Sequence, residues 1–77
     1  MAAAMVTVNI ANRTYRKSRT QAEKLIEQAA RQVKTGIAAV EKNGRLFIIL
    51  ERASRTQAKR LRREYEKAGF KVYACGL

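Results

Sequence analysis

An eight-residue segment occurs twice in this chain of 77 residues. Residues 18–25 read SRTQAEKL and residues 54–61 read SRTQAKRL, so six of the eight positions are identical. Each copy starts with Ser-x-x-Gln, a capping box in which the serine and glutamine side chains satisfy backbone amides at a helix start. Each copy then runs on to a glycine and a short apolar stretch. The repeat predicts one strand–helix–strand unit used twice.

Hydrophobic periodicity places the other elements around these two helices. Residues 6–10 alternate apolar and polar side chains, as a half-buried strand does, whereas residues 12–17 form the frayed end of that strand or a loop. Asn43-Gly44 supplies the two positive-φ residues of a tight hairpin. The predicted elements are, in order, strand 6–10, helix 19–35, strand 37–41, strand 45–51, a helix that starts after Ser54 and ends at Gly69, and strand 70–74.

This order, β-α-β-β-α-β, predicts an α+β fold of the ferredoxin-like type. We expect an antiparallel four-stranded sheet with both helices on one face, and the two strands that precede the helices parallel and adjacent at its centre. Residues 1–77 form a single domain of two pseudo-repeats, at about 5–41 and 45–76. The expected core is Val6, Val8, Ile10, Leu25, Ile26, Ala29, Val33, Leu46, Ile48, Leu50, Leu61, Tyr65, Phe70 and Val72.

The charge of the chain is strongly unbalanced. Seventeen Lys and Arg residues oppose six Glu and no Asp, which leaves a net charge of +11. Self-repulsion of this size opposes the compact state and points to a polyanionic partner, which is nucleic acid, an anionic membrane or an acidic protein surface. A solvated basic surface is the alternative, but arginine, the better phosphate ligand, outnumbers lysine.

Many of the cations fall near the two predicted strand-to-helix turns. In the predicted topology both turns emerge at the same edge of the sheet, beside two helix N-termini that attract anions. The second helix adds a stripe of like charges at three- and four-residue steps. Arg45, in the hairpin at the other edge, is expected to contribute little. The candidate anion-binding residues are Arg13, Arg16, Lys17, Arg19, Arg52, Arg55, Lys59 and Arg62.

Three further side chains, Phe47, Ile49 and Tyr73, are expected together on the open sheet face. RNA-recognition domains of this topology stack bases on aromatic residues at that face, but their glycine-aromatic signature is absent here. A homodimer contact, or packing under a chain end, is therefore favoured over base stacking.

The composition argues against enzymatic chemistry. Without His or Asp, an acid–base pair would need Glu, Lys or Tyr, and the glutamates lie scattered among basic neighbours. Cys75 is the single cysteine, so no disulfide forms within the chain and no Cys/His metal cluster is available. We expect no enzyme activity and no cofactor. The first five residues are too short and uncharged for a signal peptide, and no apolar run reaches membrane-spanning length, so a cytoplasmic location is expected.

The second half, from Ala53 to Tyr73, resembles the repeat of SPOR (sporulation-related) domains. It shares a small residue at the helix start, then Ala58 and Leu61, and the glycine-aromatic pair Gly69-Phe70 before a strand. The resemblance implies a β-α-β-β-α-β fold and binding of peptidoglycan glycans on the sheet face. Three functions are thus weighed: a nucleic-acid binder, which is favoured, a SPOR-like glycan binder, and a small viral or mobile-element inhibitor of another protein's nucleic-acid site. DNA and RNA stay equally open.

Overall fold

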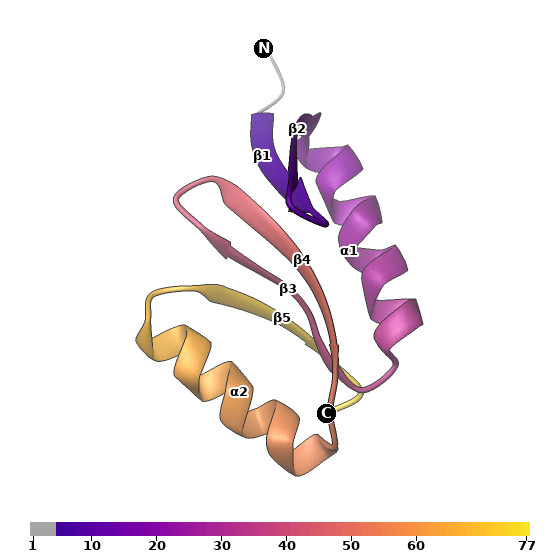
Figure 1. The fold of residues 1–77 in the computed structure, drawn as a ribbon, viewed down its shortest axis with the longest axis vertical. Helices are drawn as coiled ribbons and strands as arrows, with labels where there is room; N and C mark the ends of the chain where they lie inside the picture. Colours follow the sequence, from indigo (N-terminus) through magenta and orange to yellow (C-terminus); the bar gives the residue numbers. More distant parts are fainter. Residues whose placement is uncertain (1–4) are drawn as a thin grey trace.

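The structure is a computed structural model and describes residues 5–77; residues 1–4 of the short uncharged start lie outside it. Two helices and five strands form a single layered α+β unit (Figure 1). None of the helices within residues 5–77 is long and apolar enough to span a membrane. The elements are β1 (Met5–Ile10), β2 (Arg13–Ser18), α1 (Arg19–Val33), β3 (Gly36–Lys42), β4 (Arg45–Arg52), α2 (Arg55–Lys67) and β5 (Lys71–Cys75).

The sheet has the strand order β2-β1-β4-β3-β5. β1 pairs antiparallel with β2 and parallel with β4, and β3 pairs antiparallel with both β4 and β5. The α+β class is therefore confirmed, and so is the parallel, adjacent placement of the strands at 6–10 and 45–51. The predicted four-stranded antiparallel sheet is wrong, because the sheet has five strands and is mixed. Its last strand pairs with β3, whereas the ferredoxin-like arrangement would place it beside β1.

The additional strand is β2, which the sequence left as a frayed end or a loop. Ala11 and Asn12 adopt positive φ values of 50° and 66° and join β1 to β2 as a two-residue hairpin, with Ile10 paired to Arg13. The alternation of β2 is hard to see in the sequence because the strand lies at an edge and its first four residues are exposed. Its presence reverses the chain before α1 begins.

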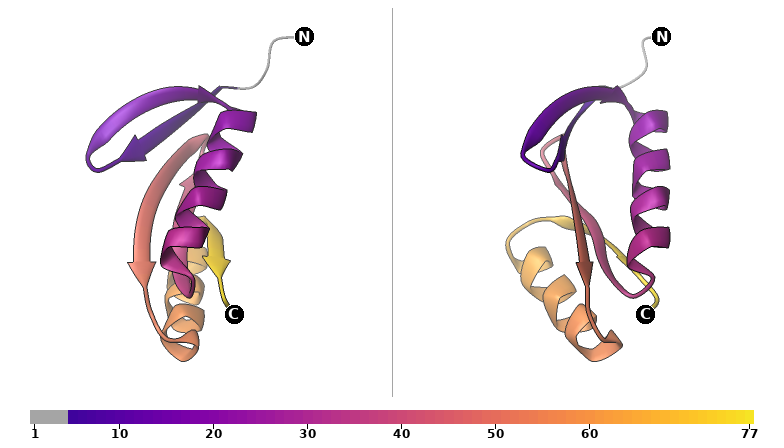
Figure 2. Two further views of the ribbon diagram at one scale, coloured as in Figure 1. Left: turned by 90° about the vertical axis from the view of Figure 1, so that its right-hand side faces the viewer. Right: turned by 45° about the vertical axis from the view of Figure 1, so that its right-hand side comes forward.

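The two helices lie on opposite faces of the sheet, which corrects the expectation that they share one. Both capping boxes form, with Ser18 bound to Gln21 at α1 and Ser54 bound to Gln57 at α2. α1 packs its Ala22 into a cluster with Val6, Val8, Ala39 and Leu46. α2 packs on β3 and β5 from the other side, where Tyr65 contacts Phe70. Figure 2 shows the sheet between the two helices.

β3 forms the centre of the core because a helix covers each of its faces. Its residues from Ile37 to Val40 are all buried, with at most 3% exposure. Such a strand reads as a continuous apolar run and not as an alternation. The expected core omitted these four residues. Ala22 and Ala58, at the positions where the helical spacing predicts the apolar stripes of the two helices, are fully buried. Of the expected residues, Val6, Val8, Ala29, Val33 and Leu46 are buried.

Leu50 was expected in the core but is 44% exposed. The pairing of β3 with β4 shifts between Ile37–Glu51 and Ala39–Ile48, so β4 carries one more residue than β3 over that stretch. Leu50 takes a positive φ of 55° in this bulge. A bulge re-aims the side chains around it, and this one directs a leucine away from the core.

Leu46→Ala and Leu50→Ala, the same substitution at two positions of β4, test whether Leu46 lies in the core and Leu50 outside it. Leu46 is fully buried, so its truncation should lower the free energy of unfolding by about 2–5 kcal/mol. Leu50→Ala should cost about 0.5 kcal/mol, as is usual for exposed positions. Urea denaturation of both variants measures the two effects, and equal losses would contradict the bulge at Leu50.

Candidate functional site

The two arginine-rich turns do not meet in space. β2 runs antiparallel to β1, and β1 runs parallel to β4, so β2 and β4 end at opposite ends of the sheet. In Figure 1, α1 starts near the top of the molecule and α2 starts at the bottom, along a longest extent of 41 Å. The expectation of one shared cationic edge is wrong, because it assumed that the strand at 6–10 leads directly into the first helix.

Arg19, at the start of α1, binds a carboxylate of the protein itself. Its guanidinium donates two hydrogen bonds to Glu41, at 2.9 Å and 2.7 Å, and the Tyr73 hydroxyl donates a third at 2.8 Å. The hydrogen bonds from Arg19 hold the pKa of the Glu41 carboxyl below its usual value, helped by Tyr73 and opposed by partial burial. Burial, together with the hydrogen bond to Glu41, raises the pKa of Tyr73. Arg19 is thus a structural cation that ties α1 to β3.

The other expected cations are spread over the molecule. Arg13 and Lys17 lie in β2 on the α1 side of the sheet, opposite Ile10 and Val6. At the far end, Arg52 donates a hydrogen bond of 3.0 Å to the Gln32 carbonyl at the last turn of α1. The rest belong to α2, namely Arg55, Lys59 and the half-buried Arg62.

The expected grouping of Phe47, Ile49 and Tyr73 is also separated. Tyr73 packs against the buried cluster on the α1 side, as do Leu25 and Ile26 of α1. Phe47 lies on the opposite face, where its ring and that of Phe70 form a T-shaped pair with centroids 6.3 Å apart. Ile49 is half-buried, next to the bulge at Leu50.

One half of the sheet has a face that is open. On the side opposite α1, α2 covers β3 and β5 and borders the end of β4 at Glu51 and Arg52. No helix in the described part of the chain covers β2, β1 and the first half of β4 on that side. Strand register places side chains on this face in two rows. The first row consists of Arg16, Thr7, Arg45 and Lys42, and the second of Thr14, Asn9 and Phe47.

The first row brings together cations from three strands. Thr7 is the strand partner of both Arg16 and Arg45, so these two arginines flank one residue on the same face. At the usual strand spacing their backbones are about 10 Å apart. Lys42 donates a hydrogen bond of 2.8 Å to the Ala68 carbonyl and thereby caps α2. Arg45, expected to lie remote from the cationic region, is thus a neighbour of Arg16.

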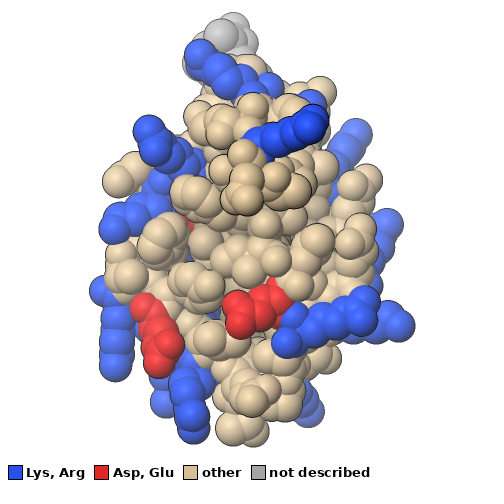
Figure 3. All heavy atoms as spheres, in the orientation of Figure 1, with Lys and Arg blue, Asp and Glu red and all other residues tan. Residues whose placement is uncertain are grey.

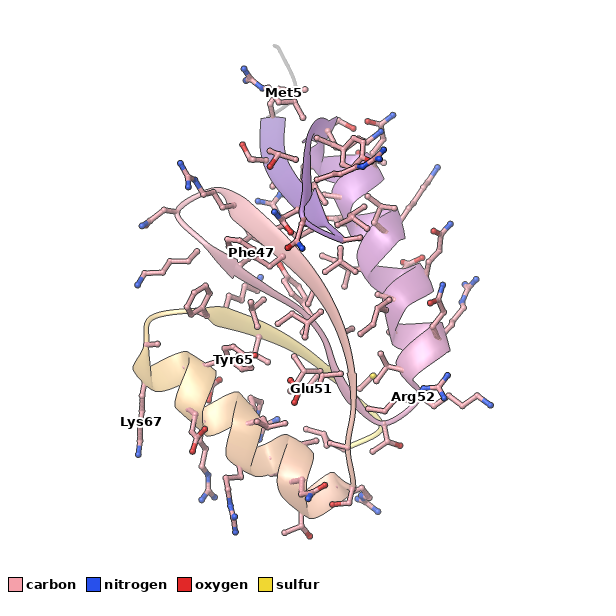
Figure 4. The ribbon with its side chains drawn as sticks, in the orientation of Figure 1. Met5, Phe47, Glu51, Arg52, Tyr65 and Lys67 are labelled. Atoms are coloured by element: carbon pink, nitrogen blue, oxygen red, sulfur yellow. The ribbon has the colours of Figure 1, made fainter. Side chains whose placement is uncertain are left out.

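Two hollows lie side by side on this open half. One has a volume of about 250 Å³ and the other about 410 Å³. Arg45 and Phe47 line both, so Phe47 separates the two hollows. Figure 4 shows Phe47 between the β1–β2 hairpin and Tyr65 of α2. The remaining linings are Thr7, Asn9, Thr14 and Leu46 in the smaller hollow, and Lys42, Asn43 and Phe70 in the larger.

Most of the positive charge has no carboxylate partner. All seventeen Lys and Arg residues lie within residues 5–77, and Arg19 is the one that forms an ion pair there. Figure 3 shows their side chains mostly around the margin of the view, with acidic side chains near its middle and at its lower left. No group of three or more His, Cys, Asp or Glu side chains suited to a metal ion occurs in the described range.

Comparison of the chain with protein-family models, with curated proteins and with solved structures finds no match. The site must therefore be interpreted from its own geometry.

Glu41→Gln tests the role of the Arg19–Glu41 pair through its pH dependence. The pKa of Glu41 is depressed in the folded protein, so its stabilisation is present above the unfolded pKa, about 4.3, and is lost as the pH falls through the folded value. The variant should be about 1 kcal/mol less stable at pH 7, a modest figure because the Arg19 side chain is 37% exposed. The difference between the two proteins should shrink as the pH falls through the folded pKa of Glu41 and vanish where that carboxyl is protonated. A deficit that stays unchanged in urea denaturation as the pH is lowered would mean that the substitution disturbs packing.

Proposed function

We propose that this protein is a non-enzymatic binder of nucleic-acid phosphates, with Arg16 and Arg45 on the open half of the sheet as its central contacts. The observation that carries the proposal is the position of two arginines, distant in sequence, on either side of Thr7. They lie on the half of the sheet face that no helix of the described chain covers. Arginine presents a planar fork of donors that fits phosphate oxygens bidentately.

The overall charge supports this function. Folding leaves sixteen cations without a carboxylate partner inside residues 5–77, in a protein of 8.7 kDa. A polyanion relieves their mutual repulsion and releases its own counterions on binding. The cations away from the open face then act at longer range, through the general positive field. They include Arg13 and Lys17 on the α1 side, Arg52 and Arg55 at the far end, and Lys59 and Arg62 on α2.

The SPOR-like glycan function is a second proposal for the same face. It is favoured by the uncharged polar side chains Thr7, Asn9 and Thr14, which line a hollow together with Phe47. An uncharged glycan and a polyanion differ in one respect that is easily measured, since only polyanion binding weakens steeply with salt. Sedimentation with purified peptidoglycan sacculi, at low and at high salt, separates the two. The inhibitor function would be indicated by capture of an acidic protein that survives nuclease treatment.

Arg16→Gln and Arg45→Gln test the central contacts, with Arg13→Gln as matched control. Arg13 lies in the same strand as Arg16, is likewise exposed and loses the same charge, but is on the opposite face of the sheet. Fluorescence anisotropy with a labelled oligonucleotide should show each of the first two variants binding about 3–10-fold more weakly. Each should also make the slope of log affinity against log salt shallower by about 0.7–0.9, the share of one phosphate contact.

Arg13→Gln should change affinity by less than about twofold, a distant charge being screened by salt. If Arg13 mattered as much as Arg16 and Arg45, the charge would act as a diffuse cloud and the assigned face would be wrong. Absence of binding to any oligonucleotide at low salt would reject the nucleic-acid function.

A further inference from the structure

The hollows on either side of Phe47 indicate which form of nucleic acid the open face suits. We propose that it binds single strands, with an unpaired base stacked on Phe47 and the adjoining phosphates on Arg16 and Arg45. The inference rests on the proposed function and adds to it the strand state of the ligand and a contact to the base. It also reverses the preference, drawn from sequence, for a dimer contact at Phe47.

The two rows of side chains match the two ends of a nucleotide. Along each strand, successive residues on one face are about 7 Å apart, so Arg45 and Phe47 belong to adjacent rows of the same strand. Arg16 and Thr14 are related in the same way on β2. A nucleotide carries its phosphate and its base on opposite sides of the sugar. It can therefore reach from the cationic row to the row that holds Phe47.

The ring of Phe47 is available to a base. In the T-shaped pair with Phe70, whose planes are inclined by 74°, each ring uses at most one of its two faces. Phe47 is half-buried. Of its two hollows, the one of about 250 Å³ is slightly smaller than the roughly 300–1,000 Å³ typical of small-molecule pockets, and the one of about 410 Å³ lies in the lower part of that range. Such a size suits single planar rings. Stacking on an aromatic side chain is the usual means of holding an unpaired base.

The positive charge around the two hollows suits a single-stranded nucleic acid. No carboxylate lines either hollow among residues 5–77, whereas Arg45 lines both and Lys42 lines the larger. The amide of Asn9 and the hydroxyls of Thr7 and Thr14 provide donors and acceptors for base edges. A larger hollow on the α1 side, of about 550 Å³, is different, because three glutamates line it beside Arg19 and Lys71, and Arg19 is already bound to one of them, Glu41.

A duplex cannot make the contact with Phe47, because its bases are already stacked on one another and present only their edges in the grooves. It would bind through phosphates alone, as would a backbone that lacks bases. The strand state therefore distinguishes base contact from simple charge attraction.

Three probes of equal length test the inference: a thymidine oligonucleotide of about 12 nucleotides, an abasic oligomer with the same number of phosphates, and a duplex of that length. The length lies within the roughly 4–16 nucleotides that single-strand sites span. At one fixed low salt concentration, the thymidine strand should bind about tenfold more tightly than the abasic oligomer, the share of one stacked base. It should also exceed the duplex. Equal binding of the thymidine and abasic probes would overturn the inference and leave phosphate binding intact, while failure of all three would reject the proposed function itself.

Phe47→Leu, with Tyr15→Leu as control, assigns the effect to one ring. Phe47→Leu keeps an apolar side chain but removes the stacking surface, so thymidine binding should fall about tenfold, to the affinity of the abasic oligomer. Binding of the abasic oligomer should not change, which shows that the variant is folded. Tyr15→Leu removes an exposed ring from the opposite face of the same half-sheet and should leave both affinities unchanged. Loss of thymidine preference in Tyr15→Leu, or its retention in Phe47→Leu, would place the base elsewhere.

Discussion

The connection from β4 through α2 to β5 is the constraint on which the rest of this structure depends. β4 and β5 both pair with β3, one on each edge, so the helix that joins them must pass over β3. Thirteen residues of helix and a few linking residues are enough to cover β3 and β5, but not the rest of the sheet. With α1 on the opposite face, β3 is buried on both sides and becomes the centre of the core. The face of β2, β1 and β4 away from α1 is left open, and the candidate site lies there.

Local features of the fold were predictable from the sequence because local interactions determine them. The two capping boxes form as expected, since Ser18, Gln21 and their counterparts in α2 act within four residues. The Asn43-Gly44 turn likewise adopts its expected positive φ values. Strand pairing is not local in this sense. The sequence does not distinguish a last strand beside β1 from one beside β3, because both place the same apolar residues in a sheet.

The site was harder to predict than the fold, since it depends on register and on one unrecognised strand. Arg19 seemed a free cation at a helix start, where a basic residue opposes the helix dipole. Its partner is Glu41, 22 residues away in β3, and no residue near Arg19 in the sequence predicts that contact. Arg16 and Arg45 become neighbours only because β2 folds back on β1 while β1 runs parallel to β4. The β1–β2 hairpin makes the two arginines neighbours, and the sequence does not indicate it, because its turn residue Ala11 has a positive φ although alanine has no preference for that conformation.

If the proposed function holds, nucleic acid contacts the open half of the sheet and no other part of the basic surface. The most direct test is a titration of isotopically labelled protein with a short thymidine oligonucleotide, followed by backbone amide chemical shifts. The largest shifts are expected at Thr7, Asn9, Arg16, Arg45 and Phe47, with little change along the exposed side of α1. Shifts concentrated on the basic residues of α2, or spread evenly over all cationic positions, would contradict the assignment to the open half of the sheet.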